Sequence, residues 1–391
     1  MKFPISHAIT NIHPPPIAEV MSWVTERPDD SREMIDLCQA VPDYAPSAAL
    51  LDHLSRVLLE PSTSRYTLDE GRIEVREKIA ARYRRRYNAH IFPENICLTA
   101  GCSQAFWLVL TTLCQPGDEI IVQTPYYFDY PMALDILGIK AIYAPFHEET
   151  GGVPSTTEIE ALVTTRTRAI LLVSPSNPTG AITPAVIIAE LYKIAKFHSI
   201  AFILDETYSE FIPDISPPHA LFSDPTWGDH FIHITSFGKT YALTGYRAGM
   251  LAASTEFIQE ALKSQDTMLI CQPHISQHAV AFGIEQLDEW VASNRDMMEQ
   301  RHQLFIREFT REGNPFSLVA SGPFFAWVRH PWHQLTSKDA VRQLINEVGL
   351  LTLPGEVFGP GMETYIRLAF GNIKEDKIPG AVNRFFEMST K

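Results

Sequence analysis

The sequence has few cysteines and no cysteine pattern that marks a metal site. Its 391 residues include five cysteines, none in a C-x-x-C pair, at positions Cys38, Cys97, Cys102, Cys114 and Cys271. This scatter argues against a zinc site and against a disulfide framework, so we expect reduced thiols. His233, His274 and His278 also lack metal-ligand spacing, and we expect no bound metal.

An excess of basic residues and a long apolar run are also missing. The formal net charge is −14, which disfavours nucleic acid and anionic membrane surfaces as partners. No apolar run reaches the length of a transmembrane helix. The N-terminal segment MKFPISHAITNIHPPP lacks a basic start followed by an apolar stretch, so it does not read as a signal peptide. We therefore expect a cytoplasmic protein with no membrane partner.

Alternating strand and helix patterns fill most of the chain. Near-continuous apolar runs predict strands that are covered on both faces, at residues 95–100, 118–124, 139–145, 168–175, 200–206, 231–236 and 248–254. Helical patterns lie between several of these runs, at 104–114, 158–164 and 185–198. This alternation predicts an α/β fold with a mainly parallel sheet sandwiched by helices.

The length and the changing pattern predict more than one domain. We expect an N-terminal arm with a short helix around residues 17–26, covering 1–45 and packing with a small domain. Residues 46–280 form the expected large domain. After a helical region from about 256 to 312, two strand-like segments and two helical ones predict a smaller α+β domain over 281–391.

Polar and charged residues follow several predicted strands. Because ligands bind at the carboxyl ends of parallel strands, these groups are expected at one edge of the sheet. Gly101, Cys102 and Ser103 open a helix, whose first amide groups can bind an anion. Ser236 and Arg247 supply further donors for a phosphate. By themselves, these residues could equally form a helix cap and ordinary ion pairs.

Lys239 and Asp205 further restrict the class of ligand that this edge of the sheet could bind. Asp205 ends an apolar strand, so its ionised carboxylate needs a cationic partner; a helix cap or a salt bridge is the alternative to a ligand. Lys239 lies in an apolar neighbourhood near Arg247, which predicts a lowered pKa and a nucleophilic amine. An aldehyde that carries a phosphate and a basic ring nitrogen would use all of these groups. That ligand is pyridoxal 5′-phosphate.

Motifs along the whole chain resemble those of the class I/II aminotransferases, which are fold-type I pyridoxal-phosphate enzymes. The matching segments follow the family order: RYTLDEGRIEVREKIA (65–80), TAGCSQAF (99–106), TPYYFDYP (124–131), SPSNPTG (174–180), DETYSEF (205–211), SFGKTYALTGYRAG (236–249) and YIRLAFG (365–371). One such motif is a modest signal, but seven in order are a strong one.

The resemblance implies a role for each matching residue. Lys239 would bond the cofactor aldehyde and later carry a proton, while Asp205 would pair with the ring nitrogen. Tyr208 and Asn177 would bind the ring oxygen, and Tyr127 would stack on the ring. Arg367 would bind the substrate carboxylate. The remaining implied contacts are phosphate binding by Gly101, Cys102, Ser103, Ser236 and Arg247, a phosphate contact from Tyr66 of a second subunit, and a carboxylate-site position for Ala40.

Several of these assignments have alternatives. The stacking ring could be a neighbour of Tyr127, because Tyr126 and Phe128 adjoin it, and Tyr66 could be an ordinary interface aromatic. Two positions depart from the family pattern: Ala40 stands where a glycine is frequent, and Gly238 stands where a serine often precedes the lysine. We also expect Trp107 and Phe324 to belong to the core and not to the pocket.

The implied activity is transfer of the amino group of an L-amino acid to a 2-oxo acid, in a homodimer with shared active sites. A second arginine for a dicarboxylate substrate cannot be placed. A β- or γ-eliminating lyase, or an enzyme resembling aminocyclopropane-carboxylate synthase, would use the same core residues and is the alternative. A ligand-sensing regulator is disfavoured because no basic DNA-binding segment precedes residue 46.

Overall fold

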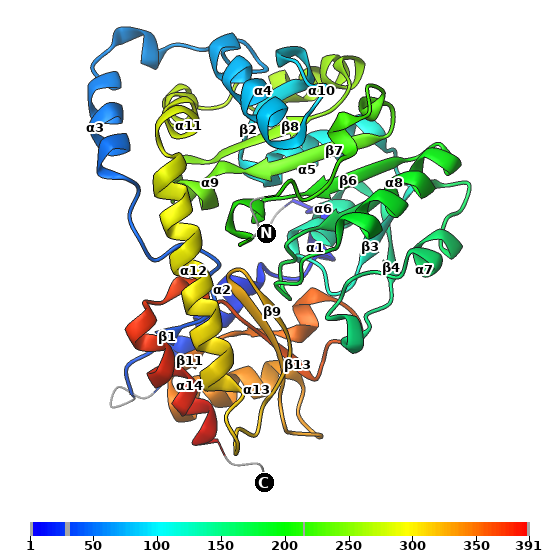
Figure 1. Ribbon diagram of the computed structural model, residues 1–391. Coiled ribbons are helices and arrows are strands. Elements are labelled where there is room, and N and C mark those ends of the chain that lie inside the picture. Colours follow the sequence, from blue (N-terminus) through cyan, green and yellow to red (C-terminus); the bar gives the residue numbers. More distant parts are fainter. Residues whose placement is uncertain (1–2, 28–31, 214–215, 389–391) are drawn as a thin grey trace.

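The computed structural model describes residues 3–27, 32–213 and 216–388 (Figure 1). In this part of the chain seven strands form one large sheet in the order β2-β8-β7-β6-β5-β3-β4. The strands are β2 (Ile96–Ala100), β3 (Glu119–Gln123), β4 (Lys140–Ala144), β5 (Thr167–Val173), β6 (Ala201–Asp205), β7 (Phe231–Ser236) and β8 (Ala248–Ala252). All seven expected strands are therefore confirmed.

The pairing within this sheet is mainly parallel, as predicted. β3 pairs in parallel with β4 and β5, and β6 pairs in parallel with β5 and β7. β8 is the exception, because it runs antiparallel to both of its neighbours, β2 and β7. The apolar run of β8 did not indicate its direction, since a strand buried on both faces has the same composition in either orientation.

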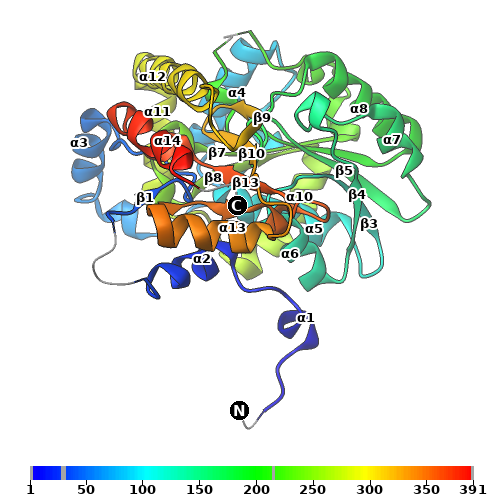
Figure 2. The same cartoon turned by 90° about the horizontal axis from the view of Figure 1, so that it is seen from below.

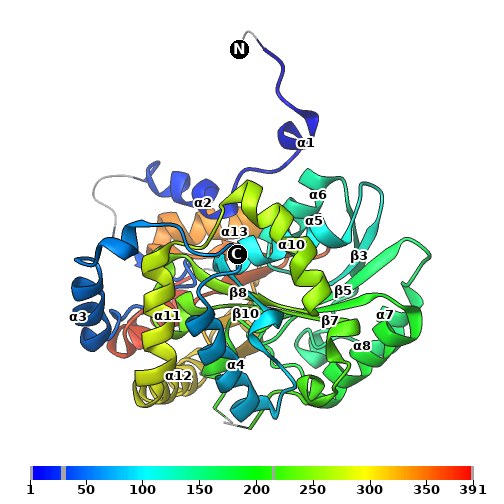
Figure 3. The same cartoon turned by 90° about the horizontal axis from the view of Figure 1, so that it is seen from above.

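Two layers of helices cover the large sheet (Figure 3). One layer contains α5 (Gly101–Leu113), α6 (Asp129–Leu137) and α10 (Thr255–Met268), and the other contains α4 (Ile73–Tyr87), α7 (Thr156–Ala161), α8 (Ala185–His198) and α11 (His274–Gln286). Alternate residues of each strand face opposite layers. On β5, for example, Leu171 packs with the first layer while Ile170 and Leu172 pack with the second.

A second core surrounds a smaller sheet. Its order is β12-β13-β10-β9, and a separate two-stranded sheet pairs β1 with β11. These strands are β1 (Ile35–Asp36), β9 (Ser317–Gly322), β10 (Phe325–Arg329), β11 (Leu350–Leu351), β12 (Leu353–Pro354) and β13 (Tyr365–Leu368). The helices packed here include α12 (Asp288–Phe309), α13 (Ser337–Gln343), which a π-helical turn over Leu344–Val348 continues, and α14 (Ile378–Phe386).

The N-terminal arm carries α1 (His7–Thr10) and α2 (Pro16–Val24). Val20 and Trp23 of α2 are buried in the second core, so this helix packs with the smaller sheet. Figure 2 shows the segment with α1 extending away from the body of the molecule. Residues 1–2, 28–31 and 389–391 of the expected arm and small domain lie outside the described residues. The domain limits at 45/46 and 280/281 stay a prediction.

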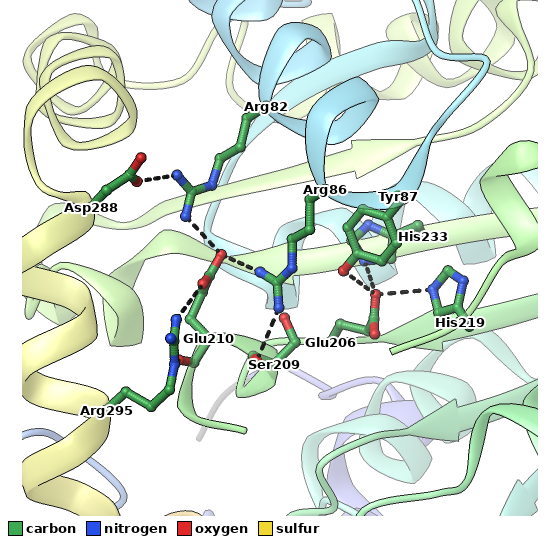
Figure 4. Close-up of polar contacts among 10 residues, drawn as sticks. All are labelled: Arg82, Arg86, Tyr87, Glu206, Ser209, Glu210, His219, His233, Asp288 and Arg295. Atoms are coloured by element: carbon green, nitrogen blue, oxygen red, sulfur yellow. Dashed lines mark hydrogen bonds and ion pairs between the residues drawn. The ribbon is translucent and has the colours of Figure 1, made fainter. Parts of the chain in front are cut away.

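An ion-pair cluster fixes the segment that follows β6 (Figure 4). Glu210 binds Arg86 and Arg82 of α4, with 3.1 Å between Arg82 Nη2 and Glu210 Oε1, and it also pairs with Arg295 of α12. Arg82 in addition contacts Asp288 at the start of α12. Because Glu210 and its three arginine partners are largely buried and mutually paired, they lock the segment to both helices, whereas Asp288 is largely exposed.

Two further α-helices lie near the large sheet. α3 (Ala48–Val57) lies beside α11, and α9 (Phe237–Thr240) follows β7 directly. The Ser236 hydroxyl caps α9 by accepting the Gly238 amide at 3.1 Å. No helix of the described residues is both long and apolar enough to cross a membrane.

Candidate active site

A cavity of about 500 Å³ lies at the carboxyl ends of β5, β6 and β7 and at the start of α5. The residues that line it come mainly from α5, α6 and the strand ends of the large sheet, with further contributions from α2, α9 and the smaller sheet. Its wall includes these residues singled out from the sequence: Ala40, Cys102, Ser103, Tyr127, Asn177, Asp205, Tyr208, Ser236, Lys239, Arg247 and Arg367. Positions spread over more than 300 residues of sequence thus meet in one space.

Lys239 projects into this cavity from α9. Its Nζ donates a hydrogen bond to the Ala40 carbonyl oxygen at 2.6 Å. Burial lowers the pKa of this amine to about 8, and the nearby charges of Arg247 and Arg367 act in the same direction. The expectation of a lowered pKa is confirmed. A neutral amine in this position can act as a nucleophile or as a base.

Arg247 covers the start of α5. Its guanidinium lies against Gly101, where an added Cβ would stand 2.5 Å from Arg247 Nη2, and Gly101 has a φ of +81°. Both the space and the backbone angle therefore require glycine. Arg247 donates to the carbonyls of Thr244 (3.0 Å) and Ala100 (3.4 Å), and no carboxylate pairs with it among the described residues. The cation and the first turn of α5 together suit an anion.

Asp205 accepts two hydrogen bonds but forms no ion pair with any described residue. Its Oδ1 accepts the Thr207 amide at 2.8 Å, and its Oδ2 accepts the hydroxyl of Tyr130. No ion pair to this carboxylate occurs within the described part of the chain, so the salt-bridge alternative is wrong. The two donors stabilise a buried negative charge while leaving it without a counter-charge from the protein.

Arg367 is an almost fully buried cation on β13, with 1 % of its surface exposed. Nη1 donates to Asn177 Oδ1 at 3.0 Å, Nη2 donates to the Cys38 carbonyl, and Nε has no partner. The guanidinium lies over the rings of Phe325 and Phe358. Burial lowers its pKa, and no described carboxylate neutralises it. Unused N–H groups remain for a planar anion such as a carboxylate.

Aromatic side chains complete the wall. Tyr127 lines the cavity and packs against the rings of Phe128 (4.7 Å) and Tyr130 (5.6 Å). Tyr126 stacks on Tyr143 and does not line the cavity, so Phe128 is the remaining alternative to Tyr127. Tyr208 is buried between Phe324 and Phe325, and burial raises the pKa of its hydroxyl.

Some expectations need correction. Trp107 lines the cavity, so its assignment to the core alone was wrong, whereas Phe324 is fully buried as expected. Tyr66 needs no correction: it lies outside this cavity wall and is 77 % exposed, and its contact with the phosphate of a second subunit stays a prediction. Tyr130 was missed. It lies in the first turn of α6, whereas Tyr127 precedes that helix, so no helical spacing in the sequence indicated it.

Comparison with known proteins supports a single family. A family model described as aminotransferase class I and II matches residues 32–385. Aromatic-amino-acid aminotransferase 2 of Thermococcus litoralis is 26% identical over 370 residues, which cover 91% of this chain and 94% of the relative. Aspartate aminotransferase of Pyrococcus abyssi is 27% identical over 356 residues, covering 90% and 91%.

A solved structure supports the same fold. A single mutant of Thermus thermophilus aspartate aminotransferase aligns with a TM-score of 0.90 at 24% identity, covering 98% of this chain and 99% of that one. The family match spans nearly the whole described chain, including every strand of the described sheets and every charged residue of the cavity wall. The chain therefore belongs to the class I and II aminotransferases, and it is an enzyme of amino-group transfer.

Proposed function

We propose that the cavity binds pyridoxal 5′-phosphate, and that the enzyme uses it to move the amino group of an L-amino acid to a 2-oxo acid. One observation supports this proposal most strongly: the cavity gathers an amine whose pKa is lowered, two cations without carboxylate partners and, in Asp205, a buried carboxylate without a cation among the described residues. A phosphorylated pyridine aldehyde together with an amino acid would supply each missing counter-charge.

The phosphate would lie at the start of α5. Arg247 offers a charged donor there, and the hydroxyls of Ser103 and Ser236 line the same cavity. The amides of Gly101 and Cys102 belong to the first turn of a 13-residue helix, whose N-terminal N–H groups favour an anion. The Ser236 hydroxyl accepts the Gly238 amide at 3.1 Å and donates to the Ala248 carbonyl at 3.4 Å, and it would turn from that long contact to donate to the phosphate.

The ring would lie between Asp205 and Tyr127. The Asp205 carboxylate would hold the ring nitrogen protonated, while Tyr208 and Asn177 would donate to the ring oxygen and Tyr127 would cover one face. When bound, pyridoxal phosphate supplies an electron sink that acidifies the Cα–H bond of a substrate amino acid. Holding the nitrogen protonated is therefore the main task of Asp205.

Lys239 and Arg367 would act on the substrate. The Lys239 amine would first bond the cofactor aldehyde and, once displaced by the substrate amine, would take the proton from the substrate Cα and return it. Its pKa of about 8 lets a useful fraction of the amine be neutral at pH 7. Arg367 would bind the α-carboxylate and thereby fix which substrate bond faces Lys239. Ala40, whose carbonyl holds the lysine amine, would border the carboxylate site.

We further propose a homodimer with shared active sites. Apolar side chains are exposed on α3 and in the segment after it: Leu51, Leu58, Leu59, Tyr66 and Leu68. A concentration of exposed apolar groups is typical of an interaction surface, and a second copy of the chain would bring Tyr66 to its neighbour's phosphate site. All five cysteines are free, which agrees with a reducing, cytoplasmic location.

The test measures the transfer of a labelled amino nitrogen from an amino acid to a 2-oxo acid. The enzyme, supplied with pyridoxal phosphate, is incubated with each ¹⁵N-labelled amino acid and with pyruvate or 2-oxoglutarate as acceptor. We expect the label to appear in the amino acid formed from the acceptor. Lys239→Ala should abolish the transfer, whereas Lys193→Ala, an exposed lysine of α8, should not. Release of labelled ammonia without labelled product would instead support the lyase alternative and contradict the proposal.

A further inference from the structure

Tyr130 lies beneath the proposed cofactor site and has no role in the function described above. Its side chain is 3 % exposed. Its ring packs edge-on against Phe106, with 4.5 Å between centroids, and against Tyr127 at 5.6 Å. These two contacts fix the direction of the ring, and its hydroxyl reaches Oδ2 of Asp205.

Each carboxylate oxygen of Asp205 accepts a hydrogen bond from a different group. Oδ1 accepts the Thr207 amide and Oδ2 accepts Tyr130. The titratable neighbours are Tyr130, Tyr208 and the thiol of Cys102. Burial raises the pKa of each of them, and the charge of Asp205 adds to the rise. They therefore remain protonated, and the Tyr130 hydroxyl can only donate to the carboxylate.

We propose that Tyr130 is a positioning residue, whose hydroxyl holds the Asp205 carboxylate as an oriented anion toward the proposed ring nitrogen. A carboxylate has about four lone-pair sites, of which the protein fills one on each oxygen through these donors. The others remain for a cationic N–H group in the cavity. The inference rests on the proposed function, because the ring nitrogen is the group that Asp205 serves.

The neighbouring carboxylate provides a matched control. Glu206 follows Asp205 on the chain but belongs to a separate cluster, in which it accepts hydrogen bonds from Tyr87 (3.1 Å), His219 (3.2 Å) and His233 (3.0 Å) (Figure 4). Tyr87, like Tyr130, is a buried tyrosine that donates to a buried carboxylate. Tyr87→Phe thus removes the same kind of hydrogen bond without touching Asp205.

The experiment measures the affinity of the apoenzyme for pyridoxal phosphate as a function of pH. A hydrogen bond to a charged group is worth enough that Tyr130→Phe should weaken binding by about tenfold or more. As the pH is lowered, the Tyr130→Phe variant should also lose its affinity for pyridoxal phosphate at a higher pH than the wild type does, because a carboxylate that has lost a hydrogen-bond donor is protonated more readily. Tyr87→Phe should leave both the affinity and its pH profile unchanged.

A double variant tests whether Tyr130 acts through Asp205. In the Asp205→Ala background, Tyr130→Phe should change the affinity no further. The proposal is overturned if Tyr130→Phe binds with wild-type affinity and pH profile, or if its effect persists without Asp205. Wild-type enzyme that binds no pyridoxal phosphate would overturn the proposed function itself, and the inference with it. Thermal melting of each variant checks that the fold is intact.

Discussion

Replacing Arg247 by methionine tests how the cavity makes Lys239 reactive. With a pKa of about 8, roughly one amine in ten is neutral at pH 7, whereas an ordinary lysine with a pKa of 10.5 is neutral in roughly one molecule in 3,000. The environment therefore raises the nucleophilic fraction about 300-fold. Burial is the largest cause, followed by Arg247 and then Arg367. Arg247→Met removes the larger electrostatic contribution and leaves the other two.

The assay measures imine formation between the apoenzyme and pyridoxal, which lacks the phosphate that Arg247 would bind. The rate is followed against pH, and the product is trapped by reduction and located by peptide mass. In the wild type the rate should rise with a midpoint near pH 8. In Arg247→Met the midpoint should move upward, and the rate at pH 7 should fall tenfold for each unit of the rise.

The control is Arg307→Met, which removes an equal charge from a largely exposed position on α12. Because water screens that charge, the midpoint of Lys239 should stay unchanged. An unchanged midpoint in Arg247→Met, or an equal shift in the control, would refute the account of how Lys239 is activated.

Three further changes test the substrate site, the packing of the backbone and the sharing of sites between subunits. Arg367→Leu should raise the KM for amino acids about 10- to 100-fold through loss of a charge-assisted contact, while the absorbance of bound cofactor stays the same; an unchanged KM contradicts the assignment. Gly180→Ala should lower the free energy of unfolding, measured by urea titration, by more than about 1 kcal/mol. The added Cβ would stand 2.3 Å from the Gly322 nitrogen, and Gly180 has a φ of +75°. A urea midpoint equal to that of the wild type would contradict this. Mixed Lys239→Ala and Tyr66→Ala subunits should regain activity, since one site of the heterodimer keeps both residues; mixtures as inactive as the separate variants speak against shared sites.

Much of the large sheet could be predicted from the sequence. Each of its strands is a short apolar run bounded by polar or turn residues, and such runs identify strands that are covered on both faces. The rule that ligands bind at the carboxyl ends of parallel strands also predicts that Asp205 and Ser236 meet at one edge of the sheet. The cavity contains these residues as expected.

What the sequence could not provide are contacts between side chains that are distant along the chain. The direction of β8 depends on the connection around Arg247, and composition does not record it. Tyr130 looks like one more aromatic in a run of four, and only the packing of α6 against the sheet brings its hydroxyl to Asp205. Trp107 sits on a helix that is apolar on both sides, so its exposure to the cavity could not be read from periodicity.

The most direct test of the central claim is chemical reduction of the enzyme loaded with pyridoxal phosphate. Borohydride converts a lysine imine into a stable secondary amine, which peptide mass spectrometry locates. The account predicts one pyridoxyl group per chain, attached to Lys239, and none on that position in Lys239→Ala. A label that is absent, or that is found on another lysine, would contradict it.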